Sequence, residues 1–171
     1  AVFGQSKEPG KEEAQENVAR TLDQYSDALQ LYQQAIRLDS NSVDGWYNLG
    51  NAQKALAQYS DAVYSYQQAL LEIGCQRQPS VAPGVLPLTG QALRINSKLE
   101  DVYLDLGNIF KILGQYSDAL KTYQQAARLD PKNAVIYWNL GGVYYILGRT
   151  PESIEMFQEA VHLDSQFMTR L

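Results

Sequence analysis

Side chains that commonly carry out catalysis or bind metals are scarce in this sequence. His162 is the only histidine among the 171 residues, and Cys75 is the only cysteine. A zinc site needs three or four such ligands close together, so these two residues cannot supply one. They also fall in different parts of the repeating pattern described below, which argues against a cysteine–histidine dyad. Because phosphate-binding glycine loops and the His-Glu-x-x-His motif are absent as well, we expect no enzyme activity and no cofactor.

The composition narrows the range of partners. A net charge of −5 and a pI of about 4.8 argue against non-specific binding to nucleic acid. No apolar run approaches the roughly 18 residues of a membrane span. A single cysteine cannot form an internal disulfide, which leaves the compartment open and favours the cytoplasm. We therefore expect a protein or peptide as the partner.

The pentapeptide Gln-Tyr-Ser-Asp-Ala occurs three times and gives the chain a regular period. Its copies begin at Gln24, Gln58 and Gln115. Recurrence at a fixed period is the mark of a repeat protein, and the interval from the first copy to the second sets that period. The interval from the second copy to the third is longer by the length of the segment 70–92, which predicts an insert there.

Each copy of the pentapeptide is flanked by two patterns typical of helices, one before it and one after it. In the downstream pattern, Ala28, Tyr32 and Ala35 are spaced by four and three, which places them on one face of a helix. Upstream, a large aromatic residue is followed by Leu-Gly at a constant offset. Glycine within a helix costs about 1 kcal/mol relative to alanine, so this recurring glycine predicts a close crossing of two helices. The recurring set is Trp46, Leu49 and Gly50, then Tyr103, Leu106 and Gly107, then Tyr137, Leu140 and Gly141.

This pattern resembles the tetratricopeptide repeat (TPR), a helix–turn–helix unit of about 34 residues with the signature Trp-x2-Leu-Gly-x2-Tyr followed by Ala-x3-Phe, Ala and Pro. The resemblance implies an all-α fold, a right-handed superhelical array of such repeats. The third repeat shows it through Tyr103, Leu106, Gly107, Phe110, Ala119, Tyr123, Ala126 and Pro131, and the fourth through Tyr137, Leu140, Gly141, Tyr144, Phe157 and Ala160.

The resemblance covers residues 9–167 as a single array, with tails at 1–8 and 168–171. Its four repeats are 9–42, 43–99 including the insert 70–92, 100–133 and 134–167. In the first repeat we expect helices at about 11–22 and 25–38. In the second we expect helices at about 44–56 and 59–75. A loop to about residue 89 and a short helix near 90–95 should then lead into the third repeat.

In this family the first helices of successive repeats line a concave groove that holds partners. Their spacing puts each set of groove residues on one stripe of its helix. Asparagine side chains suit the backbone of an extended peptide, and the lysines could pair with carboxylates. A generic solvated groove is the alternative, because Asn-Leu-Gly-Asn is close to the average sequence of the family. The implied residues are Asp44, Tyr47, Asn48, Asn51 and Lys54, then Asp101, Asp105, Asn108 and Lys111, then Trp138, Asn139 and Tyr145.

The resemblance implies a non-catalytic protein–protein interaction scaffold that binds a peptide or protein segment in this groove. A regulatory or substrate-recruiting arm of a larger enzyme, such as a protein glycosyltransferase, is one alternative. Weak self-assembly through the repeat ends is another, since Ile146, Val161 and Leu163 are expected to be partly exposed there. Chaperone-binding relatives clamp a C-terminal carboxylate with Lys, Asn, Asn, Lys and Arg. Tyr47 and Asp101 stand where cations are needed, which argues against that ligand.

Overall fold

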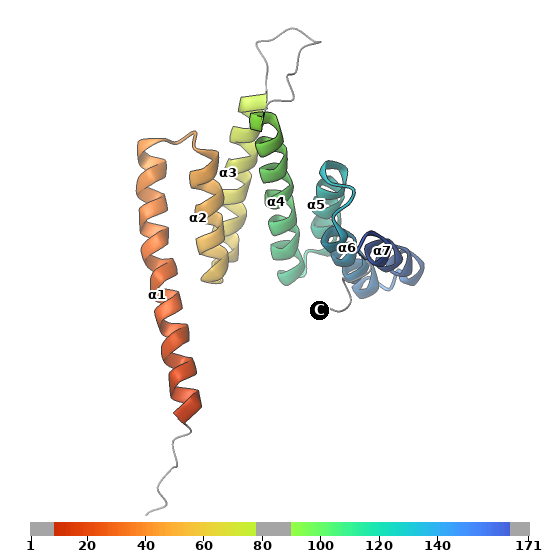
Figure 1. Cartoon of the computed structure of the whole chain (residues 1–171), viewed down its shortest axis with the longest axis horizontal. Coiled ribbons are helices and arrows are strands. Elements are labelled where there is room, and N and C mark those ends of the chain that lie inside the picture. The colour runs from red at the N-terminus through yellow and green to blue at the C-terminus, as the bar shows by residue number, and fades with distance from the viewer. Residues whose placement is uncertain (1–8, 78–89, 165–171) are drawn as a thin grey trace, which may run out of the picture. The chain divides into compact units, whose positions relative to one another are not determined.

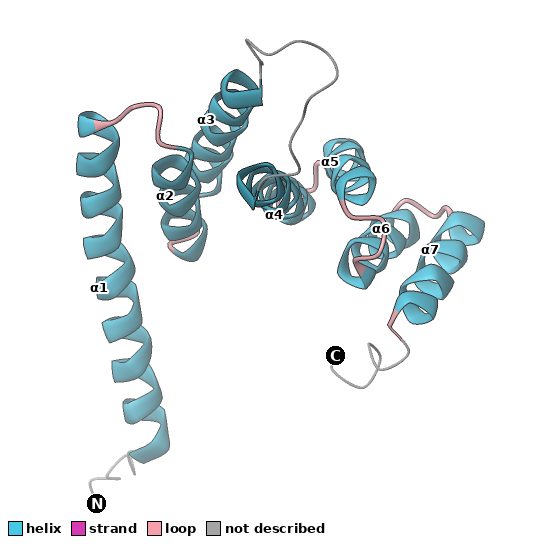
Figure 2. Ribbon diagram, turned by 45° about the horizontal axis from the view of Figure 1, so that its top comes forward, coloured by secondary structure: helices cyan, strands magenta, loops and turns pink. Residues whose placement is uncertain are grey.

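The computed structural model describes residues 9–77 and 90–164, and their regular structure is entirely helical (Figures 1 and 2). Helices that are neighbours in sequence pack against each other, α1 on α2, α4 on α5 and α6 on α7. The all-α fold of paired helices is therefore confirmed. The helices are α1 (Pro9–Leu38), α2 (Val43–Ala55), α3 (Tyr59–Arg77), α4 (Gly90–Ile112), α5 (Tyr116–Leu129), α6 (Ala134–Ile146) and α7 (Thr150–Leu163).

The chain forms two compact units, residues 1–65 and 66–171. In the first unit, α1 runs alongside α2 and continues well past its end (Figure 1). In the second unit, α5 also packs against α6, which links the helix pair α4–α5 to the pair α6–α7. The prediction of a single array over 9–167 stays a prediction.

The turn between the helices of a pair contains one residue with a positive φ angle. These residues are Ala57 at 57°, Gly114 at 72° and Gly148 at 71°. At the second of them the N–H of Gln115 donates to the carbonyl oxygen of Phe110 at 2.8 Å, which closes the end of α4. Glycine adopts this left-handed backbone without a steric penalty. Gly114 and Gly148 therefore lie just after the ends of α4 and α6.

The first repeat has no such turn, and its predicted division into helices at 11–22 and 25–38 is wrong. Instead, α1 is one continuous helix of 30 residues. Asp23 stands at the repeat position that the positive-φ residues occupy in the other repeats. Gln15 and Glu16 stand where the other first helices have Leu-Gly. The first half of α1 thus lacks both the turn residue and the residues that would pack it against the second half.

The helix that opens the third repeat begins earlier than predicted. The short helix expected near 90–95 is not separate, because α4 runs without a break to Ile112. Both α2 and α6 begin after capping residues, Ser42 and Asn133, whose side chains accept a backbone N–H of the first turn. Leu99 stands at that repeat position in α4 and is buried. It offers no capping oxygen, so the helix extends through it.

The predicted insert is helical at both described ends. Its first residues belong to α3, which continues to Arg77 and so slightly exceeds the predicted helix 59–75. Its last residues belong to α4. The predicted proline-rich loop between them, residues 78–89, lies outside the described residues.

The recurring glycines of α4 and α6 lie at close helix crossings, as predicted. A Cβ atom added at Gly107 would stand 2.5 Å from the ring of Tyr123, and one at Gly141 would stand 2.7 Å from the ring of Phe157. Both distances are far below van der Waals contact. Tyr123 itself is fully buried in a cluster that joins Ala119, Tyr123 and Ala126 of α5 to Ile136, Leu140 and Val143 of α6.

Candidate functional site

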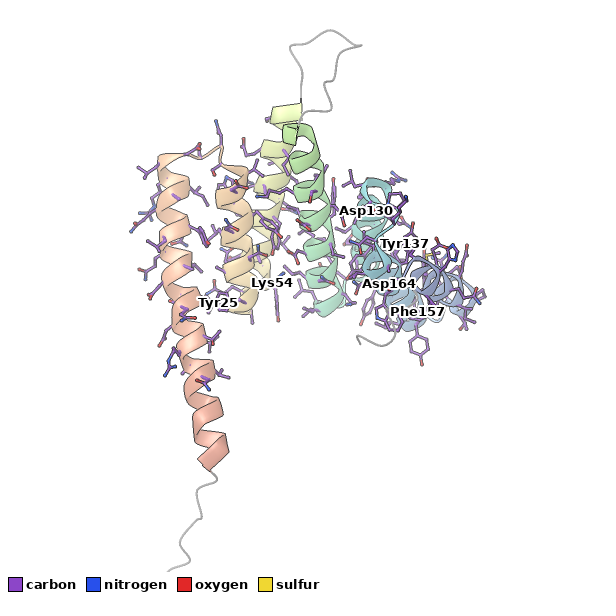
Figure 3. All side chains as sticks on the ribbon, viewed as in Figure 1. Tyr25, Lys54, Asp130, Tyr137, Phe157 and Asp164 are labelled. Atoms are coloured by element: carbon purple, nitrogen blue, oxygen red, sulfur yellow. The ribbon has the colours of Figure 1, made fainter. Side chains whose placement is uncertain are left out.

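The predicted groove residues of the second repeat lie along one side of α2. Asp44 is exposed in the first turn, and Tyr47, Asn48, Asn51 and Lys54 are half-buried. Other side chains fix the helix within its unit. The indole N–H of Trp46 donates to the carbonyl of Ser40 at 2.8 Å, and its ring meets that of Tyr64 edge-on at 6.0 Å. The label of Lys54 in Figure 3 marks the far end of this set.

The predicted residues of the third repeat form a stripe on α4 that is tied to neighbouring helices. A carboxylate oxygen of Asp105 accepts a hydrogen bond of 3.4 Å from the hydroxyl of Tyr66, on α3. The side-chain oxygen of Asn108 accepts one of 2.8 Å from the hydroxyl of Tyr123, on α5. This bond uses the oxygen of the Asn108 side chain and not its amide nitrogen. These bonds hold the stripe in a defined orientation.

Lys111 and Asn139 connect the stripe on α4 to α6. The ammonium of Lys111 donates to the side-chain oxygen of Asn139 at 2.7 Å, and the amide nitrogen of Asn139 donates to the backbone oxygen of Val135 at 3.0 Å. Burial lowers the pKa of Lys111, because desolvation penalises the charged form. No carboxylate of the described residues forms a salt bridge with Lys111. A lysine ammonium carries three hydrogens, and the bond to Asn139 uses one of them.

The other end of the stripe is acidic. Burial raises the pKa of Asp101, and the neighbouring charge of Asp105 raises it further, while Lys98 opposes both effects. Asp101 and Lys111 are ten positions apart on one helix, which corresponds to about 15 Å along its axis. The stripe therefore runs from two carboxylates, past the amide of Asn108, to the half-buried ammonium.

The aromatic residues predicted on α6 lie in two different settings. Tyr145 is 72% exposed. Trp138 packs against Phe157 of α7, with ring centroids 4.7 Å apart. Trp138 thus belongs to a surface shared by α6 and α7, whereas Asn139 joins Lys111. The part of each predicted residue in binding stays a prediction.

Sequence reasoning missed the tyrosine hydroxyls that hold this face together. The repeat pattern indicates a packing role for Tyr66 and Tyr123, and their rings are indeed fully buried. Their hydroxyls also orient Asp105 and Asn108. A signal for this exists in the sequence, because the first three repeats carry tyrosine (Tyr32, Tyr66 and Tyr123) where the fourth carries Phe157. A buried tyrosine hydroxyl usually finds a hydrogen-bond partner, which phenylalanine does not need.

Family models match both halves of this chain. A model described as TPR repeat matches residues 17–56 and 107–148, and one described as tetratricopeptide repeat matches 134–167. The chain belongs to the tetratricopeptide repeat family. TPR repeats generally mediate protein–protein interactions. No curated protein matches this TPR chain.

The family models that match this chain describe only TPR repeats, and none of them describes a catalytic domain. Within the described ranges, no three histidine, cysteine, aspartate or glutamate side chains gather where they could hold a metal ion. None of the described helices combines the length and the apolar character that crossing a membrane requires. Cys75 is exposed on α3 and His162 is exposed in the last turn of α7.

Proposed function

We propose that this TPR protein is a non-catalytic scaffold that holds an extended segment of a partner protein along the face formed by α4 and α6. The supporting observation is Lys111, a half-buried ammonium with a lowered pKa that donates to the neutral amide of Asn139. Partial burial of an ammonium without an opposite charge is unfavourable. A carboxylate of the partner would relieve that cost through a charge-assisted hydrogen bond.

The rest of the stripe specifies the other end of the ligand. Asp101 and Asp105 place two like charges near each other, so a lysine or arginine of the partner fits there. An extended peptide advances about 3.3 Å per residue, so the roughly 15 Å between the two ends spans about five residues. Asn108 lies between the ends, where its amide nitrogen can donate to a backbone carbonyl. The proposed ligand therefore has a basic side chain and a carboxylate at that separation.

Selection from a library of random linear peptides would test the proposal. Purified protein should enrich peptides that carry a carboxylate and a basic residue at the stated separation. Lys111→Ala should weaken their binding by roughly 10-fold to 100-fold, because hydrogen bonds to charged groups contribute about 1.5–3 kcal/mol. Binding should also weaken as the pH rises through the alkaline range, starting below the ordinary lysine pKa of 10.5, because the ammonium then loses its proton.

Lys121→Ala is the matched control. Lys121 is an exposed lysine of α5, paired with Asp118 at 3.1 Å, so its loss removes the same charge from another surface. Equal binding by the Lys111→Ala and Lys121→Ala variants would contradict the proposal, as would enriched peptides that lack a carboxylate.

A further inference from the structure

The last helix pair, α6 and α7, has an open apolar groove. It has a volume of about 450 Å³ and is lined by Trp138 of α6 and by Ile154, Phe157, Gln158 and Val161 of α7. Ile154 is 52% exposed and Val161 is also exposed, while Trp138 and Phe157 are half-buried, with their rings tilted by 55° to each other. The predicted exposure of Ile146 and Val161 is thereby confirmed, and Leu163 is half-buried. We call this surface the α6–α7 groove.

The molecule itself shows what covers such a surface. Each residue that lines the groove has an equivalent in the third repeat, one period earlier. The apolar equivalents pack against a cluster of core residues. To this cluster α6 contributes Ile136, Leu140 and Val143, which are almost fully buried. Gln124, the equivalent of Gln158, donates to the hydroxyl of Tyr144 on α6 at 3.5 Å. The groove is thus an acceptor for a helix with apolar residues at i, i+4 and i+7. The equivalents are Leu104, Leu120, Tyr123, Gln124 and Ala127.

One described helix carries this spacing on a surface without a neighbouring helix along its length. On α1, Val18, Leu22 and Tyr25 follow one another at i, i+4 and i+7. These side chains are 59%, 43% and 40% exposed. They line a shallow groove that touches α2 only at its last residue, Ala55. We call this surface the α1 stripe.

We infer that the α1 stripe of one copy of this chain docks in the α6–α7 groove of a second copy, in the manner in which α6 covers α4 and α5. Burial of the three apolar side chains against Ile154, Phe157 and Val161 supplies the attraction. Tyr25 and Phe157, one from each surface, are labelled in Figure 3.

The two surfaces differ, so the contact is heterologous, and every copy carries one of each. Such contacts propagate from copy to copy unless they close into a ring. The association should therefore increase steadily with protein concentration and not stop at a dimer. Both α1 and α7 carry several acidic residues, so added salt should strengthen the contact by screening their repulsion.

Sedimentation equilibrium on the full chain tests the proposal. The average mass should rise with concentration, and Leu22→Glu and Ile154→Glu should each abolish that rise. Leu31→Glu is the matched control, since Leu31 is 64% exposed on the same helix outside the α1 stripe. All three substitutions are at exposed positions of helix interiors, so circular dichroism should confirm that each variant remains folded.

A mixture of the two disrupted variants gives the decisive result. The Ile154→Glu variant keeps its α1 stripe and the Leu22→Glu variant keeps its groove, so the mixture should form a one-to-one dimer although neither variant associates alone. A dimer that appears only in the mixture supports the heterologous contact. A strict monomer at every concentration, a mixture without a dimer, or an equal effect of Leu31→Glu would each overturn the proposal.

Discussion

The first and fourth repeats have the same length in sequence but different structures. The fourth folds into a hairpin of two helices, α6 and α7, around the crossing of Gly141 and Phe157. The first is the single continuous helix α1. Both regions are helical over most of their length, so the difference lies at the turn and not in the amount of helix.

The second repeat separates the effect of the turn residue from that of the packing around it, because it turns without a glycine. Ala57 adopts φ 57° in the second repeat, although a non-glycine residue in this region costs about 1–2 kcal/mol. The helix before it carries Leu49 and Gly50, both buried. Packing can therefore sustain the turn even without glycine. The first repeat has Gln15 and Glu16 at those positions and does not form the turn.

The strongest way to disrupt the fourth repeat is to fill its helix crossing. Gly141→Ala places a methyl group 2.7 Å from the ring of Phe157, so the helices or the ring must shift. We expect a loss of roughly 1–3 kcal/mol in the free energy of unfolding, as is typical of overpacking. Urea unfolding followed by circular dichroism would measure it.

Gly142→Ala is the control for that substitution, because a Cβ atom at Gly142 has no neighbour within 4 Å. Alanine should there stabilise α6 by up to about 1 kcal/mol through helix propensity. If both variants were stabilised to the same extent, the crossing would not depend on glycine.

The sequence was sufficient to predict the fold of those repeats in which all the sequence signals of a helix pair are present. In the fourth repeat the aromatic residue, the Leu-Gly pair, the glycine after the first helix and the capping residue are all present, and the repeat folds into the predicted pair of helices. It was insufficient where one signal was missing. The pentapeptide at Gln24 suggests a second helix in the first repeat, but the period alone does not form a turn. Similarly, the period suggests a helix start near residue 100, but Leu99 cannot cap one.

For the candidate site, the sequence predicted a shared face but not its contacts. The spacing of Asp101, Asp105, Asn108 and Lys111 places them on one stripe whatever surrounds them. Which group bonds to which depends on the distance between helices, as in the pairing of Lys111 with Asn139. That distance is set by side chains from three helices and cannot be obtained from the spacing within one.

A smaller effect should follow from changing the turn residue itself. Gly148→Ala keeps the space around the residue, since no atom lies within 4 Å of a Cβ there, but forces alanine into φ 71°. The expected loss is about 1 kcal/mol. Ala57→Gly makes the reverse change and should stabilise the second repeat by a similar or smaller amount. Thermal melting of both variants would compare them, and shifts of the same sign would refute a backbone origin.

The smallest expected effect concerns Asp23, at the position where the first repeat would turn. Asp23→Gly removes the steric penalty for a positive φ, yet Gln15 and Glu16 still leave the preceding residues without the Leu-Gly crossing. We therefore expect α1 to stay continuous but slightly weaker, by about 0.4 kcal/mol from the difference in helix propensity. Amide hydrogen exchange just after residue 23 should become roughly twofold faster, and Asp23→Ala should slow it instead. A complete loss of protection at that point, with two separate helices on either side, would show that one residue decides between helix and hairpin. The packing pair would then be a consequence of the turn and not its cause.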